Sequence, residues 1–150
     1  MTNTALIGIA GVHFVVSELS RRGLVALPTV KNTAAYDIVA LNTEGTRHAN
    51  IQVKTSSKRV GFFPMPLLEK IRTGRHDFYV LIRWLEQEQR YEAFLLTGKQ
   101  AHDAVKRAIA DQRKHVKRGS RTKLFPAIHV GPQQEEDANK WTRAWVRWRL

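Results

Sequence analysis

The feature that most constrains the fold is a pair of short β-rich segments on either side of a glycine turn. Residues 36–41 read Tyr-Asp-Ile-Val-Ala-Leu, and residues 49–55 alternate Ile51 and Val53 with polar side chains. Gly45 lies in the turn between the two segments. This alternation is typical of a strand with one buried face, and two such runs around a glycine turn predict an antiparallel hairpin.

The rest of the chain alternates helical and strand patterns. Apolar residues three and four apart predict helices over 8–22, 98–115 and 134–150, and β-rich runs predict strands at 24–29, 77–84, 91–97 and 125–130. Residues 57–76 are expected to be irregular, with one helical turn at 67–72. This order predicts one α/β domain over 1–150, in which helices flank a central mixed sheet. We expect its core over about 6–97 and a basic helical part over 98–150.

The charge of the chain favours a polyanionic partner. There are 25 Lys and Arg against 13 Asp and Glu, a formal net charge of +12. Residues 98–123 hold nine basic and two acidic side chains. Nucleic acid is therefore the first candidate partner and an anionic membrane surface the second. The expected contacts with nucleic acid are Lys58, Arg59, Arg113, Lys114, Lys117 and Arg118.

Several classes of protein are excluded by what the sequence lacks. It has no cysteine, which excludes a disulfide scaffold, a cysteine-ligated zinc site and a thiol nucleophile. No apolar run approaches the length of a membrane span, and no basic region precedes the apolar residues 5–16 as in an export signal. We therefore expect a cytoplasmic protein without a membrane partner.

Three polar residues of the predicted hairpin are candidates for chemistry. Asp37 belongs to its first strand, and Gln52 and Lys54 share one face of the second. Val53 then points to the opposite face, into the core. The Asp37 carboxylate, the Gln52 amide and the Val53 carbonyl are oxygen donors suited to Mg²⁺ or Mn²⁺. Lys54 could deprotonate or orient a water, or stabilise charge at a phosphate. The alternative is an ordinary strand whose polar face meets solvent.

These segments resemble the PD-(D/E)XK, or restriction-endonuclease-like, nuclease superfamily. Residues 11–23 look like the first helix of that family, which ends in Arg-Gly before the first strand. Asn32-Thr33 followed by Asp37 resembles the loop into its metal-binding aspartate, and Gln52-Val53-Lys54 resembles a glutamine variant of the (D/E)XK strand. The resemblance implies a metal-dependent nuclease that hydrolyses DNA phosphodiesters, with Asp37 and Gln52 as metal ligands and Lys54 as the catalytic group.

The sequence departs from the family pattern at two positions. Val12 stands where related nucleases often carry a glutamate, and Gln52 is neutral where an acid is commoner. One carboxylate, one amide and one carbonyl should bind a divalent cation weakly unless substrate phosphate completes its shell. Glu18 and His13 on the first helix are possible accessory residues. The alternative function is a catalytically inactive nucleic-acid-binding module on the same fold.

Two aromatic groups leave alternatives open. Trp141, Trp145 and Trp148 form one stripe on the last predicted helix. This stripe either caps the sheet, forms a homodimer with a second copy, or stacks on nucleic acid. The apolar run at 62–66, Phe-Phe-Pro-Met-Pro, is expected to fold onto the core, with a platform for nucleic-acid bases as the alternative.

Overall fold

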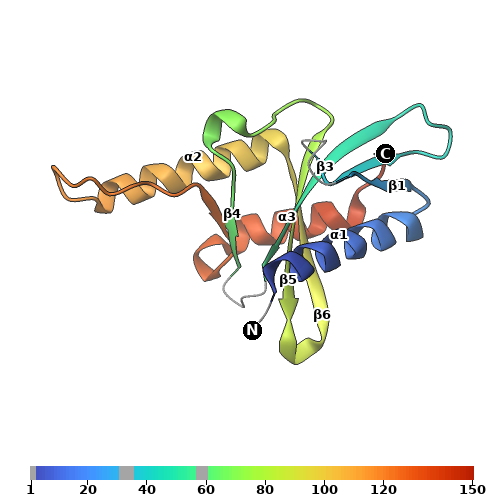
Figure 1. Cartoon of the computed structure of the whole chain (residues 1–150), viewed down its shortest axis with the longest axis horizontal. Helices are drawn as coiled ribbons and strands as arrows, with labels where there is room; N and C mark the ends of the chain where they lie inside the picture. Colours follow the sequence, from blue (N-terminus) through green and yellow to red (C-terminus); the bar gives the residue numbers. More distant parts are fainter. Residues whose placement is uncertain (1–2, 31–35, 57–60) are drawn as a thin grey trace.

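The computed structural model describes residues 3–30, 36–56 and 61–150 and has the predicted α/β architecture (Figure 1). The elements in chain order are α1 Thr4–Arg21, β1 Val25–Pro28, β2 Ile38–Leu41, β3 His48–Ser56, β4 Phe62–Pro64, β5 Asp77–Leu85, β6 Arg90–Thr97, α2 Gly98–His115, β7 Ala127–His129 and α3 Glu135–Arg147. Short 3₁₀ turns lie at Leu68–Lys70, Glu86–Glu88 and Pro132–Gln134.

The central sheet is mixed, as the sequence predicts. Its strand order is β1-β2-β3-β5-β6, with β3 and β5 parallel and the other neighbours antiparallel. The predicted hairpin is confirmed, since Ile38 pairs with Ile51 and Leu41 with His48. Two parallel strands need a crossover connection. The segment between β3 and β5 supplies it, and it contains the short strand β4, which pairs with β7 in a separate two-stranded ribbon.

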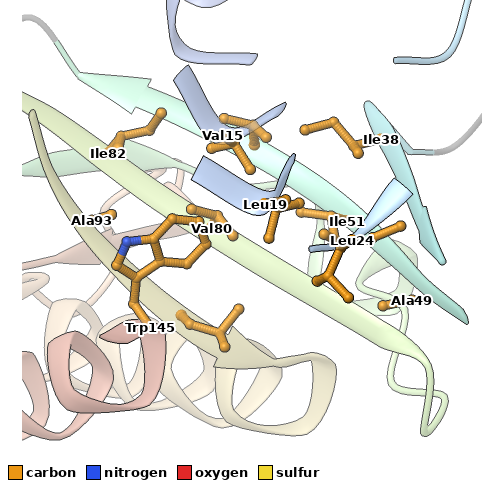
Figure 2. Close-up of a cluster of buried hydrophobic side chains, with 13 residues drawn as sticks. Val15, Leu19, Leu24, Ile38, Ala49, Ile51, Val80, Ile82, Ala93 and Trp145 are labelled. Carbon is orange, nitrogen blue, oxygen red and sulfur yellow. The ribbon is translucent and has the colours of Figure 1, made fainter. Parts of the chain in front are cut away.

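One face of the sheet is covered by α1. Val15 and Leu19 of the helix are fully buried against Ile51, Val80 and other sheet residues (Figure 2). The helix also lies very close to the end of β3. Gly11 faces Thr55 at a distance that leaves no room for a Cβ atom beside the threonine hydroxyl. Glycine at this position therefore sets how deeply α1 sits on the strand that carries Gln52 and Lys54.

The other face is covered by α2 and by the β4–β7 ribbon. Phe63 of β4 and Ile128 of β7 pack with Leu81 and Phe94 of the sheet and Val105 of α2. The expectation that residues 57–76 are irregular is therefore wrong at β4. The strand is three residues long and ends in a proline, so it has no alternating pattern, and its partner β7 lies more than 60 residues further along the chain.

The tryptophan stripe of α3 is buried within the chain. Trp141 belongs to the core on the α2 side of the sheet and Trp145 to the core on the α1 side, with 3% and 5% exposed. The Trp148 ring lies 5.2 Å from Phe78. The stripe caps the sheet beside β6, which is the first of the three alternatives. The buried Trp141 and Trp145 rings are not available to a second copy, so a homodimer through this part of the chain would need the partly buried Trp148 or other residues.

No helix within the described ranges is both long and apolar enough to cross a bilayer.

Candidate active site and nucleic-acid interface

Asp37 is held at the point where β2 begins beside β3. Its backbone N–H donates to the Ile51 carbonyl, and its own carbonyl accepts from Thr29, both at 2.9 Å. Two residues further along β3, the Val53 N–H donates to Asp37 Oδ2 at 2.7 Å. The carboxylate therefore takes the place of a backbone partner for β3, and three hydrogen bonds, two of the backbone and one of the side chain, hold the residue.

Gln52 and Lys54 lie on the α2 side of β3. Gln52 is in register with Tyr79 and Lys54 with Leu81, and both partners belong to the core on that side. Asp37 lies opposite Gln52 when the β2–β3 register is extended by one pair. The side chains of Gln52 and Lys54 are both half-buried. Burial lowers the pKa of the Lys54 ammonium, and the nearby Asp37 carboxylate opposes part of this shift.

Val53 is buried on the opposite face, as the alternation predicts. It is 8% exposed and belongs to the core beneath α1. The N–H and carbonyl of one residue point to the same side of a strand. Because the Val53 N–H meets Asp37, the Val53 carbonyl faces the same edge, where a cation beside Asp37 could reach it.

A hollow of about 400 Å³ lies between the first half of α1 and the start of β2. Val12, His13, Tyr36, Asp37 and Val53 are among its lining residues. The sequence predicts one cleft shared by Asp37, Gln52 and Lys54, whereas this hollow contains Asp37 without the other two. Val12, the position where the sequence departs from the nuclease pattern described above, lines the same hollow as Asp37.

The two accessory candidates on α1 lie in different surroundings. His13 is exposed and lines the hollow beside Asp37. Glu18 forms ion pairs with Arg21 at 3.1 Å and Arg22 at 3.6 Å, and it is not a lining residue of the hollow. Arg22 in turn donates to the Trp145 carbonyl at 2.8 Å. Glu18 therefore takes part in the contact that joins α1 to α3.

The donors at this edge fit a hard divalent cation, although with little charge. They are the Asp37 carboxylate, the Gln52 amide and the Val53 carbonyl, all oxygen ligands of the kind that Mg²⁺ prefers. One Asp37 oxygen already accepts the Val53 N–H. Within the part of the chain that the structure describes, no group of three His, Asp or Glu could hold a metal ion. A cation here would need further oxygens, from water or from a bound phosphate.

Arg72 and Tyr36 are neighbours of this site that the sequence does not single out. The Arg72 guanidinium lies 4.9 Å from the centre of the Tyr36 ring and donates to the Tyr36 hydroxyl at 2.9 Å. The backbone N–H of Arg72 donates to the hydroxyl of Tyr79, the partner of Gln52. Arg72 is exposed. It therefore presents a fixed cation over Tyr36, the residue before Asp37, and only the folding of the crossover onto the start of β2 brings it there.

The basic stretch of residues 98–123, called the basic segment below, reaches outward from the sheet. Figure 1 shows the end of α2 and the chain that follows it extending away from the rest of the molecule. Arg113 and Lys114 lie in the last turn of α2, and Lys117 and Arg118 follow it, all of them exposed. Lys114 is paired with Asp111 at 2.9 Å. The other predicted contacts, Lys58 and Arg59, lie outside the described residues.

Solved structures that resemble nearly the whole chain include two nucleases. One is the bacterial homing endonuclease I-Ssp6803I, with a TM-score of 0.56, 17% identity and coverage of 97% of this chain and 91% of that one. The other is the Holliday junction resolvase Hjc of Archaeoglobus fulgidus, with a TM-score of 0.54, 16% identity and coverage of 95% and 98%. No family model and no curated protein matches the sequence.

The chain has the restriction-endonuclease-like fold. The expected fold class, a mixed central sheet flanked by helices, is thereby confirmed. Within this fold, the edge where β2 begins carries Asp37, and the adjoining strand carries Gln52 and Lys54. At these levels of identity the likeness concerns the fold, and the function is argued from the site itself.

Proposed function

We propose that this protein is a metal-dependent nuclease that hydrolyses DNA phosphodiesters. The observation that carries the proposal is the Asp37 carboxylate, held by the Val53 N–H beside a half-buried Lys54. A fixed acid next to an amine of lowered pKa is an arrangement suited to phosphodiester hydrolysis. Two of the solved structures with this fold are nucleases by their names, a homing endonuclease and a Holliday junction resolvase.

Each residue has a distinct role in this proposal. Asp37, Gln52 and the Val53 carbonyl would hold Mg²⁺ or Mn²⁺, which supplies charge to polarise the scissile phosphate. Lys54 takes a proton from the attacking water or stabilises the charge that develops on the phosphate. Burial supports both roles. It lowers the pKa of Lys54 and so favours the neutral amine that accepts a proton, and it strengthens the interaction of the protonated form with nearby negative charge. Arg72 contacts a neighbouring phosphate, and the segment around Arg113 holds the DNA backbone.

A second candidate function is an inactive nucleic-acid-binding module. Two observations favour it: Val12 lies in the hollow beside Asp37, and Asp37 is the single acid of the proposed ligand set. In this case the basic segment keeps its role and the metal site is vestigial.

The decisive experiment is a cleavage assay with plasmid and branched DNA in Mg²⁺ and in Mn²⁺. We expect cleavage by the wild type and a loss of roughly 10²–10³-fold in Lys54→Ala, the scale for removing one preorganised stabilising group. Lys140→Ala, which removes an exposed lysine of α3, is the matched control. Equal cleavage by Lys54→Ala and the wild type would exclude Lys54 from the active site.

Val12→Glu separates the two candidate functions. The new carboxylate would enter the hollow beside Asp37 and raise the charge available to a cation. If the wild type does not cleave DNA and Val12→Glu does, the natural protein is the inactive nucleic-acid-binding module. Cleavage by the wild type establishes the nuclease.

A further inference from the structure

Three neighbouring aromatic rings lie on the outer side of the β4–β7 ribbon, one pair stacked and one pair tilted. The Phe62 ring lies 6.0 Å from Phe125 at an interplanar angle of 21°, and 5.1 Å from His129 at 58°. Phe62 of β4 is in register with His129 of β7. Phe125 is 51% exposed and His129 is also exposed. We call Phe62, Phe125 and His129 the ring platform.

The alternation of the ribbon explains why these rings face outward. Phe63 and Ile128, the neighbours of Phe62 and His129 in the sequence, are buried in the core at 0% and 2% exposed. Successive side chains of a strand point to opposite faces. One face of the ribbon therefore packs on the core, and the ring platform lies on the opposite face.

Phe125 is held in its exposed position by its backbone. The side-chain amide of Gln112 on α2 makes two hydrogen bonds with the Phe125 backbone, accepting from its N–H at 2.9 Å and donating to its carbonyl at 2.8 Å. The next residue, Pro126, accepts from the Met65 N–H at 3.0 Å. The backbone that carries the ring is therefore already fixed, so it loses little conformational entropy when a flat ligand stacks on the ring.

The surroundings of the ring platform favour a polyanion. Exposed Arg121 and Lys123 lie just before Phe125, and the end of α2 carries Arg113 and Lys114. In the view of Figure 1, β4 lies between β5 and the outward-reaching end of α2. Nucleic acid combines flat aromatic bases with phosphates, and it matches both the rings and the charge.

We propose that the ring platform stacks on unpaired bases of a nucleic acid held by the basic segment. The bases of an intact duplex are stacked on each other, so a flat ring gains most from a gap, a flap or a branch. The preferred ligand is therefore nucleic acid with a single-stranded portion. This inference rests on the nucleic-acid binding proposed above and specifies its substrate class.

The test compares two labelled DNAs, a duplex and the same duplex with a short single-stranded gap that contains 2-aminopurine. We expect the wild type to prefer the gapped DNA and to change the 2-aminopurine fluorescence. Phe125→Ala should weaken gapped-DNA binding about tenfold, within the range found when a stacking ring is removed, and leave duplex binding unchanged. Phe125→Trp, which keeps a ring, should retain the preference. Thermal unfolding checks that both variants are folded.

Three outcomes would overturn the inference, and the first two leave the proposed function standing. If the wild type binds both DNAs equally and Phe125→Ala changes neither, the ring platform does not stack on bases while nucleic-acid binding stands. If Phe125→Ala turns a dimer into a monomer in sedimentation without changing the gap preference, the rings are a contact between copies of this chain. Absence of binding to either DNA would remove the proposed function as well.

Discussion

The carboxylate of Asp37 accepts a hydrogen bond from the backbone N–H of Val53 at 2.7 Å. This bond joins the acid of one strand directly to the centre of Gln52-Val53-Lys54 on the next. It serves the fold, because it satisfies an N–H of a buried residue, and it fixes the position of the acid.

Substitutions of Asp37 should separate these two effects. Asp37→Asn keeps an oxygen that can accept the Val53 N–H but removes the charge, so metal-dependent cleavage should be lost with little change in stability. Asp37→Ala leaves that N–H unpaired and should also lower the free energy of unfolding by about 1–3 kcal/mol. Urea denaturation measures this difference. In the control Asp103→Ala, an exposed residue of α2, the free energy should change by less than about 0.5 kcal/mol. Equal stability of the two Asp37 variants would contradict the structural role.

The stability of the protein should respond to the titration of Lys54. Burial lowers the pKa of this ammonium below its value of 10.5 in the unfolded chain, so between the two pKa values the unfolded state binds more protons. Lys54 therefore lowers the free energy of unfolding most at pH values below its folded pKa. This destabilisation decreases as the pH rises through that pKa towards 10.5. Lys54→Met should raise the Tm at pH 7, and the gain should shrink as the pH approaches 10. A gain that is constant across this range would show that the pKa is not lowered.

The contact of Gly11 with Thr55 predicts opposite effects for two glycines of one helix. Gly11→Ala places a methyl group against the Thr55 hydroxyl and should destabilise the protein by about 1–3 kcal/mol, as overpacking does. At Gly8 a Cβ meets nothing within 4 Å, so Gly8→Ala should stabilise α1 by about 0.5–1 kcal/mol. Adding Thr55→Ala to Gly11→Ala should restore part of the loss. If both alanines stabilise the protein, the close packing of α1 on β3 is wrong.

Binding to duplex DNA should weaken steeply with salt. If six phosphates are neutralised, the slope of log K against log salt is roughly −5. Replacing Arg113, Lys114, Lys117 and Arg118 by alanine should bring the slope to roughly −2, since each lost contact removes about 0.9. The matched control replaces four exposed cations of α3 and the residues that follow it, Lys140, Arg143, Arg147 and Arg149. Fluorescence titrations from 50 to 300 mM salt measure both slopes, and equal slopes would remove the basic segment from the interface.

Arg72 should contribute to DNA binding at the site through its fixed position over Tyr36. Arg72→Ala should weaken binding of cleavable DNA by roughly tenfold or more, the scale of one hydrogen bond to a charged group. Tyr36→Phe keeps the ring but removes the hydroxyl that accepts from Arg72, and its effect should be smaller. Lys70→Ala, a change of an exposed cation two residues away, is the control. If Arg72→Ala binds DNA as tightly as Lys70→Ala, Arg72 does not contact the DNA.

Most helices and strands could be predicted from the sequence because their signals are local. The alternation around Ile51 and Val53 and the glycine turn at 45 are enough for the β2–β3 hairpin. The same alternation puts Val53 in the core and Lys54 on the other face. The first helix begins at Thr4, four residues earlier than its apolar spacing indicates, since Asn3 caps it through its side chain.

What depended on distant contacts could not be predicted. β4 forms only because β7 pairs with it, and Arg72 is a neighbour of Tyr36 only because the crossover folds back onto the start of β2. The Trp141 and Trp145 side chains form one stripe in the sequence, yet the position of α3 beside β6 sends them into two different cores.

The sequence by itself determined the order of the elements, the β2–β3 hairpin and which residue types lie at its edge, because these follow from periodicity and turn chemistry along a few residues. Only the tertiary structure decided that the Asp37 carboxylate meets the Val53 N–H, that Lys54 is buried enough to lower its pKa, and that Phe62 and Phe125 form one surface. The physical reason is that hydrogen-bond geometry, desolvation and ring stacking act between atoms that the folded chain brings together from distant positions.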